Sequence, residues 1–490
     1  MKGDFTRSSF DPRKHYSRVL MQQGRVSLDA DANEESSILL HHLRALTRDL
    51  FGAFGGPADG GGFNLAVDSS HHPPRLVIGA GHYYVDGILC EADADCDYAS
   101  QPDYLPVVPD DMQKGDPLLV WLDEPDADRR FWLYLDVWER HITWIEDDHI
   151  REPALGGPDT CTRAKVIWQV KALPWDPAWN PAAGASPCQI PLKTLHGLGD
   201  AHMAARLDPG AQVADPCVIS PHASYRGAEN QLYRVEIHRG GHTPSATFKW
   251  SRDNGSVATR WLGTEGDDLI AKNGRGFGAG DWIELSHDAL DLAGVPGQLV
   301  RLARVDADRL TIDSATVPSN GLMAWSETLS NPKLRRWDQR GNDDVALVDG
   351  AMPLAERSAT APNWIALEDG VQIQFAEGGE YRTGDYWLIP ARVATQDIEW
   401  PRDAAGHGLL LSPWGIAHHY APLGIVSLNA EKVVVEPCRR CIEIPAVPCR
   451  AAAANRVMIA PRPIPAAPAP APAADGGHAK PKGKRASKPK

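Results

Sequence analysis

Apolar and polar residues alternate along several stretches of the chain, and the clearest of these runs from Arg129 to Glu146. Successive side chains of a β-strand point to opposite faces, so a period of two indicates a strand. One face would carry Trp132, Tyr134, Asp136, Trp138 and Arg140, and the other Phe131, Leu133, Leu135, Val137 and Glu139. The pattern predicts a long strand with one apolar face and one aromatic and polar face.

Similar runs recur to about residue 440, and Asp86-Gly87 predicts the tight turn of a β-hairpin. The chain has 44 Gly and 40 Pro, which favours many turns. We therefore expect a mainly β protein in which an N-terminal arm and one amphipathic helix precede two or three sandwich- or barrel-like modules. The expected segments are 1–52 (arm and helix), 63–203, 204–340 and 341–450 (β-rich modules) and 451–490 (a disordered tail rich in Pro, Ala and Lys).

The N-terminal helix is expected to begin at Asp31, with Glu34 as its capping-box partner, and to end at Gly52. Leucines spaced four, three and four residues apart form a stripe on it: Leu39, Leu43, Leu46 and Leu50. The stripe is too short for a coiled coil on its own. It packs either on its own domain or on another subunit, and in the second case residues 1–52 are an assembly segment.

The formal net charge of −14 argues against nucleic acid as a partner. No apolar run approaches the ~18 residues that a membrane helix needs, and the first residues do not form a secretory signal. We expect synthesis in the cytoplasm, with release only as part of a larger assembly or by lysis, and a homo-oligomeric state.

The eight cysteines are expected to be reduced thiols, as is usual in a cytosolic chain. Only Cys438, Cys441 and Cys449 have a spacing that suggests a metal, and a zinc site would need a fourth ligand that is not nearby in the sequence. They are weak candidates against the alternative of thiols at the end of a strand. No cofactor is predicted.

The sequence leaves enzymatic activity undecided. It lacks the G-x-S-x-G, H-E-x-x-H and P-loop patterns. The carboxylates that could serve a glycosidase are Asp136, Glu139, Glu229 and Glu236. With 16 Trp against 9 Phe, indole rings could fill cores and interfaces or stack on sugars. Residues that could face a ligand are Trp138, Trp144, Trp387, His418 and His419. A carbohydrate-binding protein or glycoside hydrolase is thus one alternative, and a hydrolase using His418 or His419 is another.

The opening "MKGDFTRSSFDPRKHYSRVLMQQGRVSLDADANEE" resembles that of a bacterial domain-of-unknown-function family, in which Trp stands at the position of Ala32. The blocks "YRGAENQLYRVEIHRGG", "ATFKWSRDNGSV", "GDYWLIPAR" and "HHYAPL" are also similar to that family. Its members are similar to proteins found with phage-tail-like contractile injection systems, and the arm resembles, more loosely, N-terminal segments of phage baseplate and tail proteins. The resemblance implies a structural component near the baseplate or a fibre, with other tail proteins as partners and a glycan as a possible ligand. Deletion of residues 1–52 is then expected to leave folded β modules that no longer join the particle.

Overall fold

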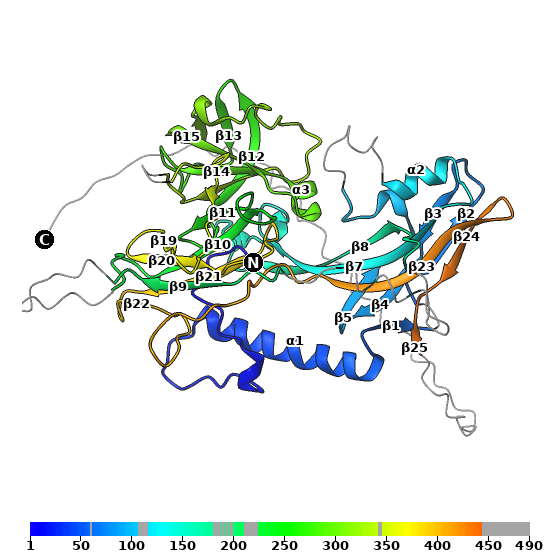
Figure 1. Cartoon of the computed structure of the whole chain (residues 1–490), viewed down its shortest axis with the longest axis horizontal. Helices are drawn as coiled ribbons and strands as arrows, with labels where there is room; N and C mark the ends of the chain where they lie inside the picture. Colours follow the sequence, from blue (N-terminus) through cyan, green and yellow to red (C-terminus); the bar gives the residue numbers. More distant parts are fainter. Residues whose placement is uncertain are drawn as a thin grey trace, which may run out of the picture. The chain divides into compact units, whose positions relative to one another are not determined.

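A computed structural model of the chain describes residues 1–58, 61–105, 116–179, 199–209, 224–341 and 345–442, together with Cys188, Leu192 and Leu195. The protein is mainly β, as predicted, and its strands form several separate sheets (Figure 1). The predicted tail at 451–490 and Cys449 lie outside the described residues. Residues 1–443 form one compact unit.

The longest strands form an antiparallel sheet in the order β24-β23-β7-β8. Their bounds are Arg130–Ile142 (β7), Arg163–Pro174 (β8), His419–Asn429 (β23) and Lys432–Pro437 (β24). The predicted apolar face of β7 is confirmed, because Phe131, Leu133, Leu135 and Val137 are buried in one core cluster. Strands that are far apart in the sequence therefore share this sheet.

Two smaller sheets and a short helix complete this core. One sheet has the order β25-β1-β4-β5 and the other β2-β3-β6. The bounds are Phe54–Pro57 (β1), Leu65–Asp68 (β2), Arg75–Ile78 (β3), Gly81–Val85 (β4), Ile88–Ala92 (β5), Cys96–Asp97 (β6), Cys441–Ile442 (β25) and Pro117–Asp123 (α2). The predicted hairpin is present, since β4 pairs with β5 across Asp86-Gly87.

A second core lies between a five-stranded sheet, β18-β11-β10-β21-β22, and a three-stranded sheet, β19-β20-β9. The bounds are Met203–Leu207 (β9), Gln231–Arg239 (β10), Thr247–Ser251 (β11), Met352–Pro353 (β18), Ile365–Ala366 (β19), Val371–Phe375 (β20), Tyr386–Arg392 (β21) and Asp397–Ile398 (β22). Phe248, Phe375 and Trp387 belong to this core. The ring centroid of Phe375 lies 5.3 Å from that of Phe248 and 5.8 Å from that of Trp387.

The segment between β11 and β18 closes into a six-stranded barrel, β12-β13-β16-β15-β14-β17. The bounds are Ala258–Glu265 (β12), Asp268–Ala271 (β13), Trp282–Ser286 (β14), Asp288–Ala293 (α3), Gln298–Asp306 (β15), Arg309–Ile312 (β16) and Lys333–Trp337 (β17). Short 3₁₀ helices span Pro12–Lys14, Tyr98–Ser100, Asp148–Ile150, Pro153–Leu155 and Ser314–Thr316.

The strand pairing crosses the module boundaries expected from the sequence. The expected boundary after residue 203 falls inside β9. β10 pairs with β21, although the sequence placed them in different modules, and β7 pairs with β23 in the same way. The barrel is thus inserted into the second sandwich, and the chain returns to the first sheet at its end.

The N-terminal helix α1 spans Asp29–Phe51 and ends at Gly52, whose N–H donates to the carbonyl of Arg48. The prediction that Asp31 caps it is wrong, because Leu28 is the N-cap residue and Asp31 lies in the first turn. The helix starts earlier than predicted where the arm folds back on it: the backbone N–H of Thr6 donates to the Asp29 carboxylate at 2.9 Å.

The first nine residues of the arm are bound to their own subunit. The terminal amine of Met1 donates to Tyr386 Oη at 2.6 Å, and Lys2 Nζ lies 3.0 Å from Glu236 Oε1. Further along, Arg7 pairs with Glu399 and Ser9 donates to Glu34. Figure 1 shows the N-terminus beside β10 and β21. This part of the arm therefore belongs to the fold.

Trp387 is a core residue, so replacing it tests the second core directly. It is 1% exposed and its indole N–H donates to the carbonyl of Leu411 at 2.8 Å. Trp387→Ala is expected to lower the free energy of unfolding by about 3–5 kcal/mol, measured by urea denaturation. Trp414→Ala is the matched control, because Trp414 is 50% exposed. Equal losses in the two variants would contradict the assignment of Trp387 to the core.

Candidate functional site

The polar faces of several strands meet where the barrel joins the second sandwich. β10 reads Tyr-Arg-Val-Glu-Ile-His from residue 233, and its apolar residues Tyr233, Val235 and Ile237 lie in the second core. The alternation of the strand turns Arg234, Glu236 and His238 to the other face, where they are also buried. Buried polar residues of the neighbouring strands continue this face: Lys249 on β11, Glu284 on β14, and Lys333 and Arg335 on β17.

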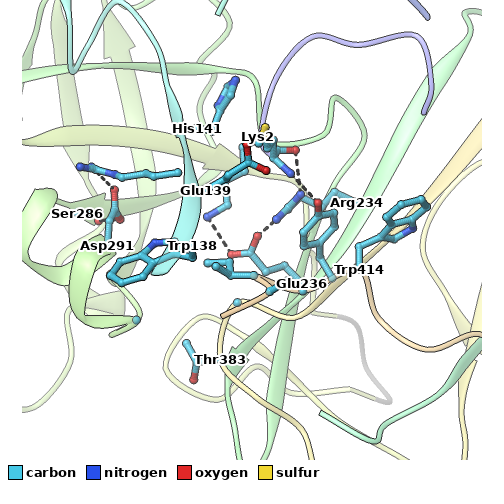
Figure 2. A pocket seen from close by; sticks show the side chains of 18 of the residues that line it. Lys2, Trp138, Glu139, His141, Arg234, Glu236, Ser286, Asp291, Thr383 and Trp414 are labelled. Atoms are coloured by element: carbon cyan, nitrogen blue, oxygen red, sulfur yellow. Dashed lines mark hydrogen bonds and ion pairs between the residues drawn. The ribbon is translucent and has the colours of Figure 1, made fainter. Parts of the chain in front are cut away.

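A cavity of about 380 Å³, the junction cavity, opens at this place. Met1, Lys2 and residues of β7, β10, β14, β17 and β21 line it, as does the loop before β23. In the view of Figure 2, Trp138 and Trp414 lie on either side of the Arg234–Glu236 pair. The charged and aromatic lining makes this cavity the candidate binding site.

Glu236 is the centre of one buried charge cluster. Its carboxylate lies 2.6 Å from Arg234 Nε, 3.0 Å from Lys2 Nζ and 3.4 Å from Lys249 Nζ. Burial opposes its ionisation, but the charges of Lys2, Arg234 and Lys249 outweigh burial and hold the pKa of Glu236 well below its usual value. Lys249 also bonds Glu284 at 2.5 Å, and this bond joins β11 of the sandwich to β14 of the barrel.

Lys333 is the centre of a second cluster, which contains three acidic residues. Its Nζ lies 2.5 Å from Glu146, 2.7 Å from Asp291 and 3.5 Å from Asp288, and Arg140 bonds Asp288 at 2.6 Å. The three carboxylates offer oxygens within 4.8 Å of one another, which is a spacing that could hold a metal ion. Because Lys333 and Arg140 already supply two positive charges there, we assign no metal site to them.

Asp136, Glu146 and Glu236 lack the raised pKa of a glycosidase acid. A general acid must keep its proton near neutral pH, which requires a raised pKa. Burial of Asp136 is outweighed by its bonds to His418 and Lys171, which lower its pKa. The same holds for Glu146, where Lys333 outweighs burial and the pKa falls to about 2. These carboxylates are fixed negative charges, as Glu236 is.

The two predicted histidines lie at the start of β23, where His419 is its first residue and His418 directly precedes it, and they bond to different aspartates. His418 Nδ1 lies 2.7 Å from Asp136 Oδ1, and His419 Nδ1 lies 2.9 Å from Asp86 Oδ2. Only His419 is among the residues that line the junction cavity. Among the described contacts, neither imidazole bonds a serine or cysteine side chain.

The predicted tryptophans separate into three environments. Trp138 lines the junction cavity, with Lys171 over its ring and the His418 ring 4.7 Å away. Trp144 lies under the guanidinium groups of Arg151 and Arg260, at 5.5 and 5.7 Å. Trp387 belongs to the second core, so the expectation that it faces a ligand is wrong.

The cysteine predictions need a correction. Cys438 forms a disulfide with Cys188, so the expectation that every thiol is reduced is wrong for this pair, and Cys438 is not available as a metal ligand. The two residues are 250 positions apart, and nothing in their spacing indicates the bond. Cys441 is an exposed free thiol, and Arg439 donates to its sulfur at 3.2 Å.

Sequence reasoning considered Glu236 only as a candidate glycosidase acid and missed the junction cavity. Other charged residues of the junction cavity, such as Lys2, Lys249, Glu284 and Lys333, come from separate parts of the sequence. One signal was available: charged residues occupy alternate positions of strands whose intervening residues are apolar, such as the Arg-Val-Glu-Ile-His run of β10. A strand buried on both faces must pair such charges inside the protein.

These features define a β-rich protein with an inserted barrel, a charged junction cavity and an N-terminal helix. The chain belongs to a family of unknown function, DUF6519, whose model matches residues 1–181 and 189–490. No curated protein and no solved structure matches it. Among the described residues, no helix is both long and apolar enough to cross a membrane.

Removing the carboxylate at the centre of the first cluster tests the charge pairing. Glu236→Gln leaves Lys2, Arg234 and Lys249 without their shared partner, and breaking a buried ion pair costs about 3–5 kcal/mol of unfolding free energy. Glu399→Gln is the matched control, since its side chain is 39% exposed and an exposed pair contributes at most about 1 kcal/mol. Chemical denaturation of both variants measures the difference, and a loss below about 1 kcal/mol for Glu236→Gln would refute the pairing.

Lowering the pH should reduce the free energy of unfolding, because His238 is buried in its neutral form. Burial lowers the pKa of His238 to about 3, against about 6.5 in an unfolded chain. Between these values only the unfolded chain takes up the proton, so stability falls as the pH drops. His238→Leu should reduce the loss of unfolding free energy between pH 7 and pH 5 by about 2 kcal/mol, measured by denaturation at both pH values. Identical pH profiles for wild type and His238→Leu would contradict the prediction.

Proposed function

We propose that this protein is a structural component of a phage-tail-like, contractile-injection particle, associated with the baseplate or a fibre. It docks on its neighbours through the leucine face of α1, which comprises Leu39, Leu43, Leu46 and Leu50. The observation that carries the proposal is the exposure of these side chains, which are 57–67% exposed in the subunit. Contact with a partner would bury them, at a gain of about 1.5–3 kcal/mol for each leucine fully covered.

The rest of α1 is held firmly on its own subunit. Arg44 pairs with Glu139 of β7 at 2.9 Å, Arg48 lies 3.6 Å from Asp86, and Ile38 is buried. A helix that is anchored on one face and bare on the other presents its leucines without a large entropic cost on binding. This arrangement suits a preformed docking surface.

The middle of the arm adds further apolar surface beside the start of the helix. Between the 3₁₀ helix at Pro12–Lys14 and the start of α1, five large apolar side chains are exposed: Tyr16, Leu20, Met21, Val26 and Leu28. A concentration of bare apolar side chains is typical of an interaction surface. The assembly segment is therefore narrower than residues 1–52: it comprises residues 15–28 and the leucine face.

The attribution to a tail-like particle rests on the resemblance of the arm, and of the sequence blocks quoted above, to the family described there. Docking through α1 is a separate part of the proposal, which rests on exposure alone. The two parts can fail independently. Co-sedimentation with purified tail-like particles from the source organism tests them together, and sedimentation velocity of the free chain tests self-association.

The double variant Leu43→Asn/Leu46→Asn tests the docking face. Both side chains are exposed, so the free energy of unfolding should change by less than about 0.5 kcal/mol for each substitution. Co-sedimentation with the particles should fall at least tenfold. Leu155→Asn is the control, because Leu155 is 67% exposed and lies outside α1 and the arm. Undiminished co-sedimentation of the double variant would reject the docking face.

Deletion of residues 1–52 is a poor test, contrary to the expectation from the sequence. It would remove Lys2 from the Glu236 cluster and the Met1 carbonyl that accepts from Arg234 and Asn254. Loss of assembly in that deletion would therefore report damage to the fold as well as loss of the docking face.

A further inference from the structure

The charges around the junction cavity do not balance. Lys2, Arg234, Lys249 and Arg335 surround only two carboxylates, those of Glu236 and Glu284. The Lys333 cluster next to it has one acidic residue more than basic ones. The two clusters together have six basic and five acidic side chains, so one positive charge remains beside the cavity in a protein whose formal net charge is −14.

Arg335 is the basic side chain that lacks a carboxylate partner within the described part of the chain. It is 9% exposed, it lines the cavity, and its Nη1 donates to the carbonyl oxygen of Gly255. A guanidinium group has five N–H donors in a planar fork that fits a carboxylate. Because an unpaired buried charge is costly, this position favours an anionic group from outside the chain.

The remaining lining provides a surface for a ring. Trp414 is half-exposed and lines the cavity, whereas Trp138, on the other side of the charged pair in Figure 2, is 3% exposed and its ring is already covered by Lys171 and His418. An indole face packs well against the apolar face of a sugar ring. His141 Nε2 is buried without a hydrogen-bond partner in the described structure and belongs to the same lining, so it can bond a ligand hydroxyl.

We propose that the junction cavity binds a small acidic saccharide whose carboxylate pairs with Arg335 and whose ring packs against Trp414. The cavity of about 380 Å³ lies within the ~300–1,000 Å³ typical of small-molecule sites and suits one or two sugar rings. The site is independent of the docking face of α1, so either proposal can fail without the other.

Titration of the full chain with three probes tests the ligand class: galacturonic acid, galactose and citrate. Isothermal calorimetry and tryptophan fluorescence measure binding. Galacturonic acid should bind, while galactose, which has the same ring without the carboxylate, should bind at least tenfold more weakly. Citrate should also bind at least tenfold more weakly, because it is an anion without a ring. Equal affinity for galactose, equal affinity for citrate, or no binding of galacturonic acid would each overturn the proposal.

Two variants tie binding to the cavity. Arg335→Gln should weaken galacturonic acid binding at least tenfold and leave the weak binding of galactose unchanged. It should not lower the thermal midpoint of the free chain, because it removes the unpaired charge; a large drop would mark Arg335 as a structural residue and contradict the proposal.

Trp414→Ala, at the half-exposed wall, should weaken the binding of both sugars at least fivefold. Leu409→Ala is the matched control, since Leu409 is 42% exposed and outside the cavity lining. Unchanged binding of both sugars by Trp414→Ala would contradict the assignment of the saccharide site to the junction cavity.

Discussion

The arrangement of this protein depends on the ion pairs made by the buried carboxylate of Glu236. It holds together Lys2 from the start of the chain, Arg234 from its own strand and Lys249 from β11, and Lys249 continues the network to Glu284 of the barrel. A buried ion network gives little net stability compared with apolar packing, but it tolerates few alternative arrangements. The network therefore fixes how the inserted barrel and the N-terminal segment sit on the second sandwich.

This fixed junction separates the arm into two parts with different roles. Residues 1–9 complete the charge network and the surface next to it, and they are part of the folded subunit. Five large apolar side chains of residues 15–28 and the leucine face of α1 remain exposed. A segment that is tied at both ends and bare between them is suited to meet a partner without large rearrangement.

Local patterns predicted local structure well. The period-two pattern of β7, the hairpin turn at Asp86-Gly87 and the end of α1 at Gly52 are all present, because each depends on residues close together in the chain. The pairing of β10 with β21, the Cys188–Cys438 disulfide and the junction cavity depend on residues more than 100 positions apart. Local patterns such as the alternating charges of β10 indicate buried charge pairs but do not identify the partners, and the predicted boundaries consequently cut through sheets. The start of α1 was also misplaced, because Thr6 of the folded-back arm bonds Asp29.

The leucine face of α1 is exposed in the subunit, and we propose that it is covered in the assembly. Hydroxyl-radical footprinting read by mass spectrometry measures the solvent exposure of individual leucine side chains. In the free full-length chain, Leu39, Leu43, Leu46 and Leu50 should be oxidised at rates close to that of exposed Leu155. In the particle they should be protected at least fivefold while Leu155 is unchanged. Strong protection of the four leucines already in the free, monomeric chain would contradict the account.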